Sequence, residues 1–452
     1  MTTFVTYTIA LLAASALFWH CQILKKSGAV ARDPISLLGL VVIVSIGLLR
    51  ETRAIPESQA VQLGLILLMV VLAFQLVIRS IRKRLMHKMF LSAYLPAVVS
   101  ALLFIINAVM NPDLSLSLLL GRSLGVISLA VTGLILSLSS LTLRDLAGVI
   151  VVSVSFVYTI APLTGDNWRS CDKFKCGPFG AMYIGPFSSE NTVSMLCGVG
   201  ILCGLIGYYS TRNFAAFGLF ALALYATESR TSQLAIAVAL TAWPLAAACA
   251  RFMHRNTDTL HPTPGQWRLI VAVFSTGVAG LFWEGFKLLL EAQPADFSNR
   301  GTVWILGLAA LGKDWLTGLG LDRWYIFQSV GAVPAHFPHS EYLFLLFTGG
   351  AGAVVGLFWI FVQSMRSASA HKGTFAFAVS YVVYLAVVGM TELYWNPIAL
   401  DGNALIILPL IFILARKVVS DLPNRQDLRP SNSPRLPTIR RPYELRRPSG
   451  RF

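Results

Sequence analysis

Long apolar stretches alternate with short polar segments along almost the whole chain. Most of these stretches approach the roughly 20 residues that an α-helix needs to cross the hydrocarbon core of a bilayer. Because lipid offers no hydrogen-bond partners to backbone amides, such segments are expected to be helices. The two shortest, 35–49 and 403–415, also fit tilted, re-entrant or interfacial helices. The thirteen expected spans are 3–24, 35–49, 59–78, 90–110, 115–141, 146–163, 188–207, 213–227, 231–250, 269–288, 340–364, 373–391 and 403–415.

The composition excludes a water-soluble fold. Of 452 residues, 56% are hydrophobic and only 13% are charged, and the mean hydropathy is +0.68. Soluble domains carry about 25% charged residues. We therefore expect an all-α polytopic membrane protein with about 12–13 transmembrane helices. Residues 1–415 form the expected membrane domain, and residues 416–452 form a separate tail.

The distribution of basic residues predicts the orientation in the membrane, because Lys and Arg gather in cytoplasmic loops. With the N-terminus outside and the C-terminus in the cytoplasm, 25 of the 36 basic residues fall on the cytoplasmic side. The strongest markers are the loop 79–88 and the tail, which is rich in Pro, Arg and Ser and is expected to be disordered. Anionic lipid headgroups account for the net charge of +15, so no nucleic-acid partner is needed.

Two of the six cysteines, Cys171 and Cys176, lie in a loop on the expected outer side. Because that side is oxidising, the pair is a candidate disulfide. A zinc site is the alternative, but two further ligands are missing nearby. The other four cysteines lie in or beside expected spans, where packing is the simplest role.

The longest outer loop covers residues 289–339. Its content of Trp, Leu and Gly is too high for a disordered segment, and loops of this length without a function are uncommon. We expect a short helix over 302–311 that ends at Gly312, followed by a turn through Gly318 and Gly320. Such a helix can lie on the membrane surface and cover a pocket.

Three arginines lie at or inside the expected outer boundary. Arg122 interrupts an apolar span, where an ionisable residue is a functional candidate unless it snorkels to the headgroups. Arg230 begins a span directly after Glu228 and its neighbour Ser229, so Glu228 is either an ion-pair partner or part of a site. Arg300 precedes the helical pattern of the outer loop, and a guanidinium at a helix N-terminus favours phosphate or carboxylate.

His339 lies at the end of the same outer loop, in the stretch AHFPHSEYL. A structural, hydrogen-bonded role is common for a single histidine, but cationic neighbours lower the pKa of an imidazole and keep it neutral, as a general base must be. His336 competes for this role, and Pro338 prevents us from placing both on one helical face. No metal-ligand motif, phosphate-binding loop or dinucleotide fingerprint is present, so we expect neither metal nor cofactor.

Three pieces of sequence, between residues 180 and 365, resemble the O-antigen ligase and O-antigen polymerase family. The first is GPFSSENTVSMLCG, which contains Asn191, together with ATESRTSQLA, which contains Arg230. The second is NRGTVWILGLAALGKDWLTGLGLDRW, similar to an Arg-x-x-x-Trp helix and an x-P-x-x-G-x-G turn, although Leu316 stands where the family commonly has proline. The third is His339, Ser340, nine residues and then Gly350.

The resemblance implies a glycosyltransferase with a GT-C-like fold in the bacterial cytoplasmic membrane. Its donor would be a glycan on polyprenyl pyrophosphate, transferred without metal or cofactor, and with inversion, to a hydroxyl of a glycan, lipid or protein acceptor. By motif, His339 would be the catalytic base and Arg230 and Arg300 would hold the pyrophosphate. Arg122 is added on its position alone. Supporting roles fall to Glu228, Glu341, Ser340 and Asn191.

Other readings remain open at the level of sequence. Within the family, the enzyme could be a polymerase of repeat units rather than a ligase, although the spacing from His339 to Gly350 favours a ligase. A transporter or flippase of lipid-linked or anionic solutes is a different class, which would place its ionisable groups near the middle of the membrane. A membrane scaffold, whose arginines serve only as anchors, is disfavoured by the ordered character of the outer loop.

Overall fold

A computed structural model provides the structure. Some sequence predictions lie outside the residues that it describes, namely those on His336, on the basic residues 83–88 and on the tail beyond residue 420. The structure describes residues 1–52, 59–82, 91–171, 175–187, 189–207, 214–255, 264–334, 337–369, 372–400 and 404–420.

Each of the thirteen predicted spans is a helix in the described part of the chain. Ten helices are long and apolar enough to cross a membrane, and three shorter apolar ones cover Glu190–Ile206, Phe214–Thr227 and Leu405–Ala415. The segment at 35–49 belongs to the ten. The main helices are α1 (Thr2–Lys26), α3 (Pro34–Glu51), α4 (Gln59–Arg82), α5 (Leu91–Met110), α6 (Leu116–Leu138), α7 (Leu143–Ile160), α8 (Glu190–Gly207), α9 (Phe214–Thr227), α10 (Arg230–Arg255), α11 (Pro264–Leu290), α14 (Glu341–Ala368), α15 (Lys372–Thr391) and α16 (Ala404–Ser420).

The outer surface of these helices is apolar. Large side chains such as Leu67, Phe74, Leu102, Trp283 and Val355 are exposed on it. Water would make such a surface a site of aggregation, whereas lipid tails solvate it. The chain is therefore an all-α, multi-pass membrane protein, as its hydrophobic pattern predicts.

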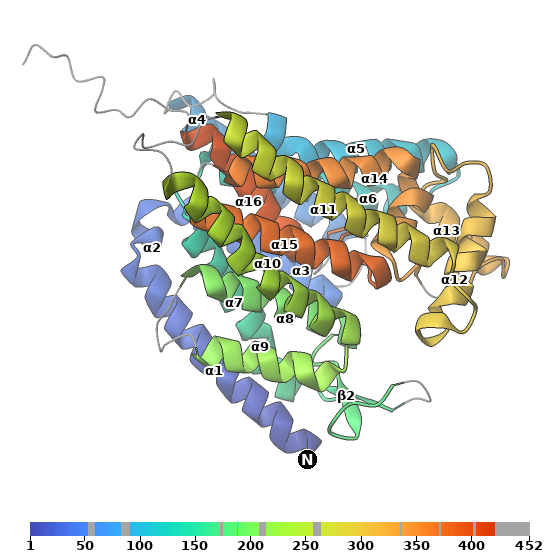
Figure 1. The fold of residues 1–452 in the computed structure, drawn as a ribbon, viewed down its shortest axis with the longest axis horizontal. Coiled ribbons are helices and arrows are strands. Elements are labelled where there is room, and N and C mark those ends of the chain that lie inside the picture. The colour runs from blue at the N-terminus through green and yellow to red at the C-terminus, as the bar shows by residue number, and fades with distance from the viewer. Residues whose placement is uncertain are drawn as a thin grey trace, which may run out of the picture.

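Buried tyrosines and glycines hold the inner helices together. Tyr384 on α15 donates its hydroxyl hydrogen to the Met195 carbonyl of α8 at 3.0 Å. Gly198 makes this approach possible, because a Cβ there would collide with the Tyr384 hydroxyl. Small residues serve membrane proteins in this way, since helices in lipid associate by close packing and interhelical hydrogen bonds. α15 is the most enclosed of the long apolar helices, and α10 packs along it (Figure 1).

Three short elements gather at one end of the helix bundle (Figure 1). A hairpin pairs β1 (Trp168–Ser170) with β2 (Ala181–Tyr183) in antiparallel register. Cys171 and Cys176, the candidate pair, form a disulfide beside it. The outer loop supplies α12 (Asp296–Leu311) and α13 (Leu321–Ser329).

The expected helix over 302–311 is the regular part of α12, which ends at Gly312 as predicted. The turn through Gly318 and Gly320 docks on a kink in α14. Leu319 N–H donates to the Phe347 carbonyl at 2.7 Å, and Gly320 N–H donates to the Thr348 carbonyl at 3.1 Å. The second and third pieces of the family resemblance are therefore in direct contact.

Gly350 forms this kink with φ 65° and ψ −164°, a region of backbone space that is nearly restricted to glycine. A Cβ at this position would also collide with the Leu316 carbonyl. The position of Gly350 in the His-Ser-x9-Gly pattern thus has a structural cause, because the turn can approach α14 only at a residue without a side chain.

Candidate functional site

A cavity of about 500 Å³ lies at the end of the bundle that carries α12 and the hairpin. We call it the basic cavity, because four of its lining residues are Arg or Lys. It is enclosed by the starts of α8, α10 and α12, by the end of α15 and by the segment before α14. Its lining residues are Arg169, Lys175, Ser189, Glu190, Asn191, Glu228, Ser229, Arg230, Thr231, Phe297, Ser298, Asn299, Arg300, Val303, His339 and Glu392.

Five of the eight site residues expected from sequence line the basic cavity: His339, Arg230, Arg300, Glu228 and Asn191. They come from four segments that are far apart in the chain. The remaining three lie elsewhere. Ser340 and Glu341 are fully buried behind the cavity, and Arg122 lines a different cavity, described below.

The backbone around the basic cavity is unusual. In the described part of the chain, five residues other than glycine have a positive φ, and all five line this cavity. Such conformations cost about 1–3 kcal/mol each and tend to cluster at functional sites. The five residues are Glu228 (φ 55°), Phe297 (49°), Ser298 (62°), Asn299 (70°) and His339 (48°).

The loop that carries His339 is fixed from α12. Trp304 is fully buried, and its indole N–H donates to the Pro338 carbonyl at 2.7 Å. Arg300, four residues earlier on the same helix, lines the cavity. The Arg-x-x-x-Trp spacing therefore has a physical meaning, since one helical turn places a cation in the cavity and anchors the histidine loop beside it.

Arg300 binds a carboxylate that sequence reasoning missed. Its Nη1 donates to Glu392 Oε1 at 2.8 Å and to the Thr391 carbonyl. Glu392 follows the end of α15 and is buried, and this burial raises the pKa of its carboxyl, while Arg300 acts in the opposite direction. Both hydrogen bonds use one nitrogen of the guanidinium, which has five N–H donors, so the group can still bind an oxyanion.

Arg230 is far more accessible than Arg300. Its side chain is 79% exposed and makes a 3.5 Å ion pair, through Nε, with Glu228 Oε1. Thr231, the next residue, accepts a hydrogen bond of 2.8 Å from the Thr391 hydroxyl and so joins the start of α10 to the end of α15. Arg230 therefore projects from a rigid junction, and its terminal nitrogens face solvent or a ligand.

A second group of charges was not predicted. Lys175 Nζ lies 3.2 Å from Glu190 Oε1, and Arg169 Nη1 lies 3.5 Å from Glu190 Oε2. Beside them, the side chain of Asn191 is buried and its Oδ1 has no hydrogen-bond partner within the described part of the chain. A sequence signal for Glu190 existed, because it directly precedes Asn191. Arg169 lies on β1 and Lys175 lies between β1 and β2, so both reach the cavity through the fold of the hairpin.

Ser340 and Glu341 are hydrogen-bonded to the segment that carries Glu392. Ser340 caps α14 and donates to the Gly389 carbonyl at 3.3 Å. Glu341 Oε2 accepts hydrogen bonds from the backbone N–H groups of Tyr394 at 3.1 Å and Trp395 at 3.0 Å. Both residues therefore contact the chain at 389–395, and their supporting roles stay a prediction.

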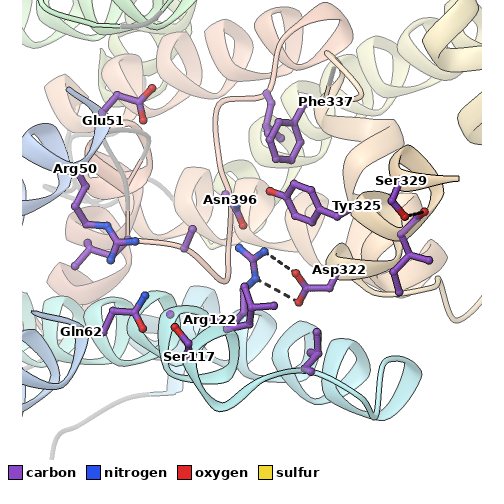
Figure 2. A pocket seen from close by; sticks show the side chains of 17 residues that line it. Arg50, Glu51, Gln62, Ser117, Arg122, Asp322, Tyr325, Ser329, Phe337 and Asn396 are labelled. Atoms are coloured by element: carbon purple, nitrogen blue, oxygen red, sulfur yellow. Dashed lines mark hydrogen bonds and ion pairs between the residues drawn. The ribbon is translucent and has the colours of Figure 1, made fainter. Parts of the chain in front are cut away.

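Figure 2 shows a larger cavity of about 1080 Å³. Its border includes α13, which lies at the same end of the bundle as α12 (Figure 1). The segment after α15 separates the two, since Glu392 lines the basic cavity while Leu393 and Asn396 line the larger one. The larger cavity is bordered by the end of α3, the starts of α4 and α6, and α13. It is lined by Arg50, Glu51, Gln62, Leu114, Ser117, Leu118, Gly121, Arg122, Asp322, Tyr325, Ile326, Ser329, Phe337, Leu393, Asn396, Ala399 and Leu400.

Arg122 belongs to this larger cavity and is paired there with Asp322 of α13 (Figure 2). The Arg122 Nη2 to Asp322 Oδ1 distance is 2.7 Å, and the Nε to Oδ2 distance is 3.4 Å. Asn107 of α5 completes the arrangement by donating to Asp322 Oδ2 at 2.7 Å and accepting from Asp322 N–H at 2.9 Å. This buried pair fastens α13 to the bundle.

Comparison with protein-family models and with curated proteins finds no match. Within the described residues, no group of three or more His, Cys, Asp or Glu side chains is arranged to hold a metal ion. The features that indicate a function are therefore the geometry of the two cavities and the short motifs whose residues line or contact them.

Proposed function

We propose that the chain is a GT-C-like membrane glycosyltransferase that moves a glycan from polyprenyl pyrophosphate to an acceptor hydroxyl in the basic cavity. The observation that carries the proposal is the convergence of His339, Arg230 and Arg300 in one cavity with a strained backbone. Three motifs that are separate in sequence thereby contribute to a single site, as a common chemical function requires.

The reaction assigned to the cavity is a single displacement. The oxygen of the acceptor hydroxyl forms a bond with the anomeric carbon of the donor, and the bond from that carbon to the phosphate oxygen breaks. The bonding electrons leave with the pyrophosphate, and the hydroxyl proton passes to the His339 imidazole, which acts as general base. Attack opposite the leaving group inverts the anomeric configuration.

Arg230 and Arg300 are assigned to the leaving pyrophosphate. The negative charge on this group grows as the sugar departs, and cations already in place stabilise that charge without reorganisation. Arg300 is held by Glu392, which is consistent with a fixed position, whereas Arg230 is exposed and can follow the substrate. Arg122 stays outside this assignment, because it lies in the larger cavity.

The proposed location is the bacterial cytoplasmic membrane, with both cavities on its outer face. Arg144 and Arg251, two of the expected cytoplasmic residues, line a pocket at the other end of the helices. That distribution supports the orientation predicted from the positive-inside rule. The position of both cavities at helix ends also favours an enzyme over a transporter, whose sites lie near the middle of the membrane.

The decisive experiment is the replacement His339→Asn, because asparagine tolerates the left-handed backbone at φ 48°. Membranes of a strain that lacks the native gene would be supplied with each variant and assayed for transfer of lipid-linked glycan to its acceptor. Loss of a general base lowers a rate by about 10²–10⁴-fold, so we expect at most 1% of transfer to remain.

His336→Ala, three residues away, serves as the matched control and is expected to keep its activity. Full transfer by His339→Asn at normal protein levels contradicts the assignment of the base. The same assay separates the two family functions, because loss of a ligase leaves long chains on the lipid carrier and loss of a polymerase leaves single repeat units. The spacing from His339 to Gly350 makes ligase the expected outcome.

A further inference from the structure

The larger cavity differs from the basic cavity in its balance of charge. Arg50 and Arg122 are matched by Glu51 and Asp322, so the lining has no net formal charge. The basic cavity has four Arg or Lys residues against three Glu residues. An anionic ligand therefore gains little in the larger cavity, and a neutral ligand that both donates and accepts hydrogen bonds is a better match for its lining.

One side chain of the larger cavity lacks a hydrogen-bond partner among the described residues. Gln62 is 6% exposed, it lines the cavity, and its Oε1 accepts no hydrogen bond from the described part of the chain. A buried polar atom left unpaired lowers the stability of the fold. Gln62 packs against Gly121, which also lines the cavity, and Ser117 lies on the same helix (Figure 2). The Gln62 Oε1 atom can therefore accept a hydrogen bond from a ligand in the cavity.

The remaining walls supply hydrogen-bonding groups and aromatic surface together. Asn396 is 8% exposed, and its Oδ1 accepts a 3.3 Å hydrogen bond from Ile398 N–H within its own turn. The rings of Tyr325 and Phe337 lie edge to face with centroids 5.6 Å apart. Sugar rings present apolar C–H faces and hydroxyls that donate and accept, so planar polar groups beside aromatic rings suit them.

We propose that the larger cavity binds a neutral sugar unit of a glycan substrate, with the Gln62 amide as a hydrogen-bonding contact. The inference rests on the proposed function for its biological setting, since neighbouring residues of one segment, Glu392 and Leu393, line the cavity that contains His339 and the larger cavity respectively. Glu341 fixes that segment through the N–H groups of Tyr394 and Trp395. A glycan that occupies the larger cavity would therefore be placed next to the reacting groups.

The test measures binding of fluorescently labelled neutral oligosaccharides, built from hexoses and N-acetylhexosamines, to the full chain in lipid nanodiscs. Gln62→Leu keeps the volume of the side chain and removes its polar atoms. We expect at least one oligosaccharide to bind the unmodified chain and to bind this variant about tenfold more weakly. Thermal stability should be unchanged or higher in Gln62→Leu, because the substitution removes an unpaired buried atom.

Arg230→Ala, in the basic cavity, is the matched variant. It should keep the oligosaccharide affinity and bind inorganic pyrophosphate more weakly, whereas Gln62→Leu should do the reverse. The effect of Gln62→Leu on the KM for lipid-linked donor and on that for acceptor then identifies which substrate supplies the sugar. An increase confined to one of the two KM values is the expected result.

Three results would overturn this inference. The first is that no neutral oligosaccharide binds, and the second is that binding is unaffected by Gln62→Leu. The third is that farnesyl pyrophosphate, rather than sugar, loses affinity in this variant, which would make the cavity a lipid site. Glycan transfer that continues despite any of them leaves the proposed function intact. Conversely, sugar binding without any dependence of transfer on His339 would refute only the proposed function.

Discussion

The two cavities share one end of the bundle but differ in the pairing of Arg122 and Arg230. In the larger cavity, Arg122 and Asp322 have side chains only 14% and 5% exposed and form a short, doubly hydrogen-bonded pair. In the basic cavity, Arg230 is 79% exposed and lies 3.5 Å from Glu228. Arg300 of the basic cavity is paired with the buried Glu392 at 2.8 Å, much as Arg122 is with Asp322. Position near the end of a transmembrane helix thus does not decide the role of an arginine.

The backbone shows the same contrast. Every described residue other than glycine that has a positive φ lines the basic cavity, and none lines the larger one. The larger cavity is built mostly from the ends of regular helices. Because strained conformations persist only where surrounding contacts impose them, their concentration marks the basic cavity as the place where positions matter most. This is the pattern expected if one cavity performs chemistry and the other binds.

The largest effect is expected from Asp322→Ala, which leaves Arg122 buried without its partner and removes the hydrogen bond that Asn107 donates to Asp322 Oδ2. Breaking a buried pair costs about 3–5 kcal/mol, so the variant should unfold in denaturant or heat well before the unmodified chain. Glu228→Ala breaks the exposed pair and should cost less than about 1 kcal/mol. Chemical unfolding in detergent micelles measures both.

Asp322→Asn is the graded control, since its amide can still bond with Asn107 and should lose less stability than Asp322→Ala. Equal stability of Asp322→Ala and Glu228→Ala would remove the difference between the two cavities. Arg122 would then again be a candidate for binding pyrophosphate.

A second, smaller effect is expected from Gly350→Ala, at the kink that receives the turn leading to α13. The new methyl group would occupy the space of the Leu316 carbonyl in a backbone region that alanine avoids. We expect a loss of about 2 kcal/mol in unfolding free energy. Asp322 follows this turn, so sugar affinity in the larger cavity should also fall.

Gly352→Ala is the control for that substitution. Gly352 lies in the same helix and is exposed, and a Cβ there meets no atom within 4 Å. It should be neutral or slightly stabilising, because alanine favours helix over glycine. If both variants behave alike, the contact between the turn and α14 does not shape the larger cavity.

The helices and part of the basic cavity could be predicted from the sequence, for physical reasons. Apolar length alone determines where a chain can cross lipid, so all thirteen helices could be located, ten of them long enough to span a membrane. Arg300 and His339 could be linked because both lie in the loop over residues 289–339. Arg230 joined them only through a motif, and its position next to Arg300 depends on the packing of α10 against α15.

Other features depend on tertiary contacts that no local pattern encodes. Arg122 and Asp322 are 200 residues apart, and nothing in LLLGRSLGV points to a carboxylate on α13. Glu392 follows the end of α15 as an isolated acidic residue, with no motif around it. Lys175 and Glu190 meet because the segment after the first strand of the hairpin returns across the start of α8. In each case the ion-pair partner can be identified only from the three-dimensional packing of the chain.

The smallest effect, and the one most specific to the basic cavity, concerns Arg300 and the buried carboxyl of Glu392. Burial already raises the pKa of this carboxyl, and Arg300 is the main influence that lowers it. Arg300→Ala should raise the pKa further. The folded state then favours the protonated form, while the unfolded chain ionises near the ordinary value of 4.5. Stability is therefore retained at low pH and lost as the pH rises from about 5 towards 8.

Thermal unfolding of Arg300→Ala should accordingly occur a few degrees lower at pH 8 than at pH 5, relative to the unmodified chain. The double variant Arg300→Ala with Glu392→Gln removes the titrating group and should show no such dependence. A pH dependence that persists in the double variant would contradict the assignment of the effect to Glu392.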